Sequence, residues 1–89
     1  MNQFIAGSMI SGEADPDAHE FTVTEIKSIP THSVWDTRQV EDVYELLTRV
    51  INSGQDSLVI STGMLPLLLN RMEIEKLQAE LSSILAFIR

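Results

Sequence analysis

The chain has 89 residues, of which 44% are hydrophobic, four are glycine and three are proline. A chain of this length forms one small domain, and this composition excludes a wholly disordered, collagen-like or low-complexity protein. Thirteen acidic residues against six basic ones give a formal net charge of −7 at pH 7. Because nucleic-acid surfaces are bound by basic residues, we expect no direct contact with DNA or RNA.

Residue types that are missing from the chain narrow its chemistry further. There is no cysteine, so the protein forms no disulfide and offers no thiolate for metal binding or catalysis. No apolar run approaches the roughly 20 residues that span a bilayer, and no positive charge precedes an apolar stretch at the N-terminus, as it does in a secretory signal peptide. We therefore expect a cytoplasmic protein that does not bind membranes.

The negative charge is concentrated in the N-terminal part of the chain. Residues 1–36 hold six acids and one base, a net charge of −5, whereas residues 37–89 hold seven acids and five bases, a net charge of −2. Residues 7–17 mix small, turn-forming and acidic side chains without a sustained period, which predicts no regular structure. We expect residues 1–19 to form a mobile or partner-ordered arm, with a short strand as the alternative, and residues 20–89 to form a single globular domain.

A strand is predicted for residues 20–27, which are rich in β-branched side chains. Simple alternation places Phe21 and Val23 on one side of this strand and Ile26 on the other. Residues 28–33 are expected to form a turn or loop, because Pro30 has no N–H group to donate to a sheet.

The clearest predicted element is a helix over residues 37–53. Asp36 is a good N-cap, Gly54 favours a left-handed C-cap, and Trp35 and Val40 are spaced to form a hydrophobic staple. Apolar residues follow the helical period and form a single stripe: Val40, Val43, Tyr44, Leu47, Val50 and Ile51.

The remaining residues predict a second strand and a second helix. Residues 57–61 are short, apolar and β-branched, which is typical of a buried strand, and a strand–helix–strand order suggests a right-handed parallel crossover. Pro66 is tolerated in the first turn of a helix, so we expect a helix to begin close to residue 64 and to run to the C-terminus. Asn70 interrupts the early heptads of this helix.

Together these elements predict a small, single-domain α+β fold with the order strand–helix–strand–helix and a long C-terminal amphipathic helix. A mostly α-helical hairpin is the alternative.

The sequence carries no motif for catalysis or for a cofactor. The serines lie in no nucleophile motif, the glycines match no phosphate-binding fingerprint, and His19 and His32 lack the helical spacing of a metal site. We therefore expect no enzyme activity, no cofactor and no bound metal.

Two groups of residues are candidates for contact with a partner. Trp35 and the C-terminal seam of Leu77, Leu81, Ile84 and Ile88 are apolar enough to form either the core of a monomer or the contact of a dimer. On the helix over residues 37–53, Glu41, Asp42 and Glu45 form an acidic face whose ordinary role is to be solvated.

The favoured hypothesis is therefore a non-catalytic regulator, adaptor or chaperone that binds another protein in a bacterial or viral cytoplasm. We expect a small acidic homodimer that associates through residues 65–88. The alternative is a phage-type inhibitor or nucleic-acid mimic that blocks a basic groove of a host defence or transcription protein.

Overall fold

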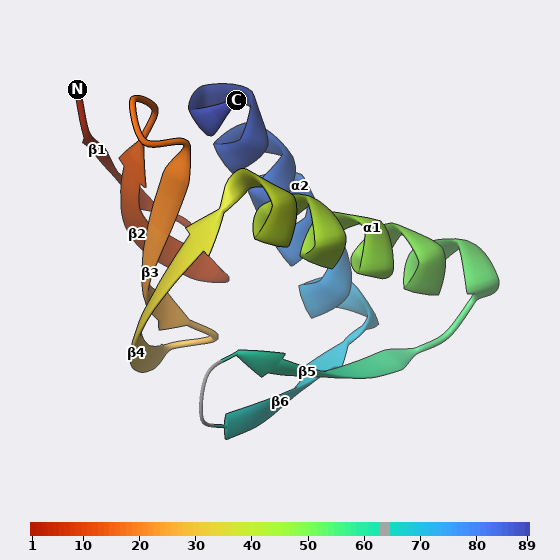
Figure 1. Ribbon diagram of the computed structural model, residues 1–89. Coiled ribbons are helices and arrows are strands. Elements are labelled where there is room, and N and C mark those ends of the chain that lie inside the picture. The colour runs from red at the N-terminus through yellow and green to blue at the C-terminus, as the bar shows by residue number, and fades with distance from the viewer. Residues whose placement is uncertain (63–64) are drawn as a thin grey trace.

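The computed structural model describes residues 1–62 and 65–89. A four-stranded antiparallel sheet with the order β1-β2-β3-β4 precedes the first helix, and a β5–β6 hairpin separates it from the second helix (Figure 1). The elements are β1 (Gln3–Ala6), β2 (Ile10–Asp15), β3 (Glu20–Ile26), β4 (Ile29–Asp36), α1 (Thr37–Ser53), β5 (Ser57–Thr62), β6 (Leu65–Asn70) and α2 (Arg71–Ile88). The predicted α+β class with a long C-terminal helix is confirmed.

Helix α2 is the element that joins the parts of the fold. It contacts β2 and β3 of the four-stranded sheet, both strands of the hairpin, and α1, while α1 also contacts β4. One face of α2 is fully buried along its length, at Ile74, Leu77, Leu81, Ile84 and Ile88. The C-terminal helix is therefore the centre of the core.

The inner face of the four-stranded sheet is built on Phe21, Val23 and Ile26, which are all buried. The alternation in the sequence predicted Ile26 on the opposite side from the other two, and this is wrong. A β-bulge between Val23 and Glu25 shifts the register of β3 by one residue, so Ile26 returns to the core face.

The N-terminal segment differs from the irregular arm that its composition predicted. It forms β1 and β2, and Met9, Ile10 and Ala14 are buried in the core. Small residues hide the alternation of β2, because Gly12 takes an inward position without a side chain. A Cβ atom at Gly12 would lie 2.0 Å from the carbonyl oxygen of Thr22, so only glycine fits this close approach.

The predicted loop over residues 28–33 is also wrong, because β4 begins directly after a two-residue turn. Ile26 pairs with Ile29, and the turn residues Lys27 and Ser28 both have positive φ angles of 51° and 64°. Pro30 is compatible with a strand here because β4 is the outermost strand of its sheet.

The helix predicted over residues 37–53 is confirmed with both ends. The Asp36 carboxylate accepts a hydrogen bond of 2.8 Å from the backbone N–H of Gln39, and Gly54 has a φ angle of 78° at the C-cap. Trp35 and Val40, the predicted staple, are both buried.

The segment after α1 departs from the prediction. Strand β5 pairs with β6 in an antiparallel hairpin, so there is no parallel crossover between β3 and β5. A helix beginning close to residue 64 is wrong: residue 64 itself lies outside the described residues, but residues 65–70 form β6. Helix α2 begins only at Arg71, where the Asn70 side chain and Glu73 form a reciprocal capping box.

Among the residues that the structure describes, no helix has the length and apolar character needed to cross a membrane.

Candidate functional site

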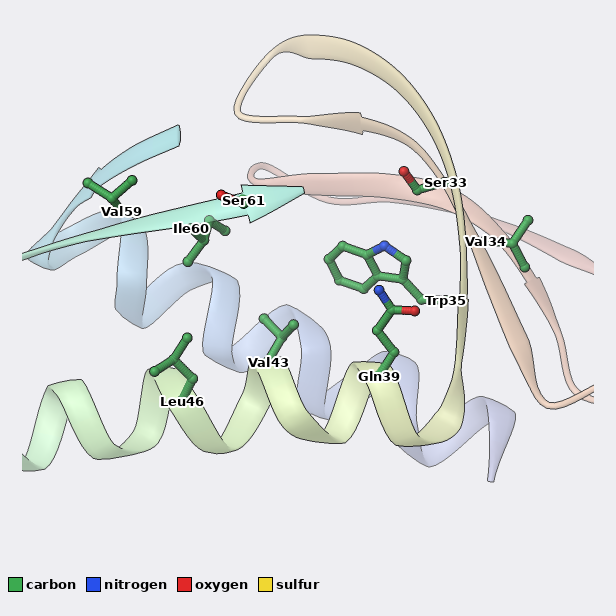
Figure 2. Close-up of a pocket in the computed structure, with 9 residues that line it drawn as sticks. All are labelled: Ser33, Val34, Trp35, Gln39, Val43, Leu46, Val59, Ile60 and Ser61. Atoms are coloured by element: carbon green, nitrogen blue, oxygen red, sulfur yellow. The ribbon is translucent and has the colours of Figure 1, made fainter. Parts of the chain in front are cut away.

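A pocket of about 490 Å³ opens where β4, α1 and β5 meet (Figure 2). Three residues from each element line it: Ser33, Val34 and Trp35 from β4; Gln39, Val43 and Leu46 from α1; and Val59, Ile60 and Ser61 from β5. We call it the β4–β5 pocket.

The local structure of each element explains why these side chains converge. Gln39, Val43 and Leu46 follow the helical period, so they share the side of α1 that faces the pocket. Trp35 projects from the end of β4 toward the same space as Gln39 (Figure 2). The indole forms a wall of the pocket while only 2% of the tryptophan surface is exposed. Only a small part of Trp35 is therefore open to the pocket.

The lining is mixed, with aliphatic side chains beside uncharged polar groups. Its polar side chains are the hydroxyl groups of Ser33 and Ser61, the Gln39 amide and the Trp35 indole. None of these four groups is an acid or a base near neutral pH. Burial of apolar surface with a few orienting hydrogen bonds is the chemistry of a binding site.

A second feature is the outer face of the four-stranded sheet, which points away from the helices. Glu13 pairs with Phe4 and Thr22, and Thr22 pairs with Val34, so these four residues form one row across the sheet. Phe4 and Val34 are 61% and 51% exposed. By the same register, four of the six acids of residues 1–36 share this outer face: Glu13, Asp15, Glu20 and Glu25. The carboxylate of Asp36, opposite Glu20, caps α1 instead.

Over the described strands β1–β4, the outer sheet face carries no compensating lysine or arginine. Lys27 is the one base of residues 1–36. Its ammonium group lies 2.5 Å from the Leu68 carbonyl oxygen and 3.2 Å from Glu73, so it is directed to β6 and α2. The concentration of negative charge that the sequence predicted for the N-terminal part is therefore a single strongly acidic surface.

The residues predicted as partner contacts are in the core instead. Leu77, Leu81, Ile84 and Ile88 are all 0% exposed. Their burial within one chain gives no support to the expected dimer contact, which stays a prediction. Trp35 is buried as well, at 2% exposure, and lines the β4–β5 pocket with the little surface that it exposes.

The predicted acidic face of α1 is present only in part. Asp42 and Glu45 are exposed, whereas Glu41 is half-buried and accepts a hydrogen bond of 2.9 Å from the guanidinium group of Arg89. One of these three acids therefore anchors the C-terminus.

The two histidines have separate positions. His19 Nδ1 lies 2.6 Å from the carbonyl oxygen of Ile88, and His32 is exposed on β4. Within residues 1–62 and 65–89, no group of three or more His, Asp or Glu side chains is placed to hold a metal ion.

Sequence reasoning found β5, which lines the pocket, but missed β6, the strand that pairs with it. Val59 and Leu68 pair across the hairpin and are 58% and 60% exposed. Their neighbours Ile60, Leu67 and Leu69 are buried. The alternation over residues 57–61 was a usable signal, but the run of three leucines at 67–69 concealed it in β6.

Comparison of the chain with protein-family models, with curated proteins and with solved structures finds no match.

Proposed function

We propose that this protein is a non-catalytic binding protein that acts by holding a segment of another protein in the β4–β5 pocket. One observation carries the proposal: an uncharged pocket walled by Trp35 lies directly beside two outermost strands, β4 and β5. Pockets of this size bury most of a small bound segment, and a few polar groups in them fix its orientation. Regulator, adaptor and chaperone are roles that such binding serves.

The charge of the molecule favours a basic partner. The chain has a net charge of −7, and its outer sheet face adds a local concentration of acids. Such a field speeds the association of positively charged partners and repels negatively charged ones. The expected occupant is therefore an apolar segment flanked by lysine or arginine in a different protein.

Self-association is less well supported by the same argument. A second copy would bring an equal charge of −7, and the seam expected to form the dimer is buried. A homodimer would have to use a surface other than Leu77, Leu81, Ile84 and Ile88, and it remains a prediction from the sequence.

The pocket can be tested with a pair of matched charge substitutions on α1. Gln39 is exposed and lines the pocket, and Asn52 is exposed on the same helix outside it. Gln39→Arg places a long cationic side chain at the pocket, so it should block an apolar segment and repel a basic one. Asn52→Arg makes the same change in charge elsewhere.

The measurement is co-purification from the native host, identification of the retained protein, and reconstitution of the complex from the two purified chains. We expect one basic protein to bind wild type and Asn52→Arg alike and to bind Gln39→Arg at least about tenfold more weakly, a change of about 1.4 kcal/mol. The proposal would be contradicted if wild type, Asn52→Arg and Gln39→Arg bound every identified partner equally well.

A further inference from the structure

The four outer strand edges of the fold are not equally protected. Strand β1 has only four residues. Strand β4 contains Pro30 and a register shift opposite Val23 and Glu25. Short strands, proline and bulges are devices that keep an edge from pairing with another chain.

The edge of β6 is protected in a different way. It contains Pro66, and Lys27 donates a hydrogen bond to the outward carbonyl of Leu68. Strand β5 has none of these features, since its sequence over Ser57–Thr62 contains no proline, glycine or charged residue. It is the one edge among the four that lacks a protecting device in the described part of the chain.

The direction of the free backbone groups of β5 follows from the Lys27 contact. The Leu68 carbonyl accepts from Lys27, so it points away from β5. Leu68 is opposite Val59 in an antiparallel register. When one residue of such a pair directs its backbone N–H and C=O groups away from the partner strand, the residue opposite does so as well. Val59 therefore presents its N–H and C=O at the free edge, as does Ser61 two residues on.

These outward backbone groups of β5 border the β4–β5 pocket. Val59, Ile60 and Ser61 form one wall of it, and Trp35 on β4 forms the facing one (Figure 2). Within residues 1–62 and 65–89, no hydrogen bond from outside the hairpin reaches the backbone of Val59 or Ser61. A further strand would lie about 4.8 Å from β5, over the apolar side chains of Val43 and Leu46.

From this arrangement we infer that β5 takes up an extended segment of the partner protein as an added β-strand. The inference rests on the proposed function and specifies how the pocket is used. Main-chain hydrogen bonds to Val59 and Ser61 hold the segment, and its alternate side chains enter the β4–β5 pocket. The occupant is a different, basic chain, because a second copy would bring another charge of −7 to the same edge.

The test uses a synthetic peptide obtained by selecting a phage-displayed library of random peptides on the wild-type protein. Val59→Pro removes the outward N–H but leaves the bonds between β5 and β6, since an outward N–H is the position at which an edge strand tolerates proline. Val59→Thr is the matched control, which keeps the N–H and a β-branched side chain. Amide exchange of the β6 residues checks that the hairpin is intact in both variants.

We expect Val59→Pro to bind the peptide about tenfold or more weakly than Val59→Thr. The proline variant loses one main-chain hydrogen bond to the peptide and weakens the adjacent ones. In the wild type, the amide protons of Val59 and Ser61 should exchange freely and become protected when the peptide binds. This protection reports strand pairing even if the proline variant fails to fold.

The contrary results separate the inference from the proposed function. If Gln39→Arg abolishes binding but Val59→Pro does not, and the two amides stay unprotected, the pocket is used without strand addition and the inference is overturned. If no selected peptide depends on Gln39, the proposed function itself fails. If the two amides are protected in the free protein and lose protection on dilution, a second copy fills the edge, which also overturns the inference.

Discussion

Glu80 is the residue that fastens the N-terminal strands to α2. Its carboxylate accepts hydrogen bonds from the backbone N–H groups of Ser8, Met9 and Ile10 at 2.9, 3.0 and 3.0 Å, and from the Ser8 hydroxyl at 2.7 Å. Hydrogen bonds to a charged acceptor are stronger than neutral ones. This one side chain thus provides the hydrogen-bond acceptor for the backbone N–H groups at the turn between β1 and β2.

We predict that Glu80→Ala lowers the free energy of unfolding by about 3 kcal/mol, since it leaves the two partly buried N–H groups of Met9 and Ile10 without their acceptor. Glu75→Ala on the same helix is the control. Glu75 is exposed and forms a surface ion pair with Arg71, so its removal should change stability by less than about 1 kcal/mol. Denaturant unfolding measures both, and equal effects would show that the Glu80 contacts contribute little.

The turn between β3 and β4 offers a stabilising substitution. Lys27 and Ser28 both adopt positive φ angles, which cost L-residues roughly 1–2 kcal/mol each. Ser28→Gly removes this strain, so we expect it to raise the free energy of unfolding by about 1 kcal/mol. Ser28→Ala keeps a Cβ and should give no gain. A thermal melt compares the two, and an equal response to both substitutions would argue against strain at this position.

At the scale of the element, the start of α2 depends on the ionised form of Glu73. The backbone N–H of Asn70 donates to the Glu73 carboxylate at 2.9 Å, and Lys27 lies 3.2 Å from it. The Asn70 hydrogen bond, more than the Lys27 charge, lowers the pKa of Glu73 below its ordinary value of 4.5. Folding therefore favours the deprotonated carboxyl.

This lowered pKa predicts a loss of stability in acid. The contribution of Glu73 to stability is complete above pH 4.5, the ordinary pKa of a glutamate. It disappears as the pH falls through the lowered pKa of Glu73 in the folded protein. The difference in stability between wild type and Glu73→Gln should thus shrink on acidification below pH 4.5. Lys27→Met, which leaves the Asn70 bond, should show a weaker acid dependence than wild type. Parallel pH curves for wild type and Glu73→Gln would contradict this account.

At the scale of the whole molecule, the buried seam of α2 makes a clear prediction about oligomeric state. Leu81 is 0% exposed, whereas Met72 on the same helix is 65% exposed. Leu81→Asp would bury a charge without a partner, so it should unfold the protein, at a cost of more than about 4 kcal/mol. Met72→Asp should leave the fold intact.

Circular dichroism and sedimentation check the two variants together. The expected result for Leu81→Asp is loss of helical signal. A folded Leu81→Asp monomer derived from a wild-type dimer would instead show that the seam is an interface, as the sequence pattern allowed.

The sequence determined the features that arise within a few residues of one another. Asp36 and Gly54 marked the ends of α1, because capping is a contact between near neighbours in the chain. The β-branched run identified β3, and counting charges located the acidic half of the molecule. The α+β class followed from these local periods.

The tertiary structure decided what required a partner distant in the chain. Leu67–Leu69 became a strand because β5 supplies the pairing, and Asn70 is a helix cap because that strand ends there. Leu81 is a core residue because the sheet and α1 both cover it. The β4–β5 pocket exists because residues 33–35 and 59–61 are brought together from opposite ends of α1. Periodicity measures how apolar one face is, whereas long-range packing alone sets what lies against it.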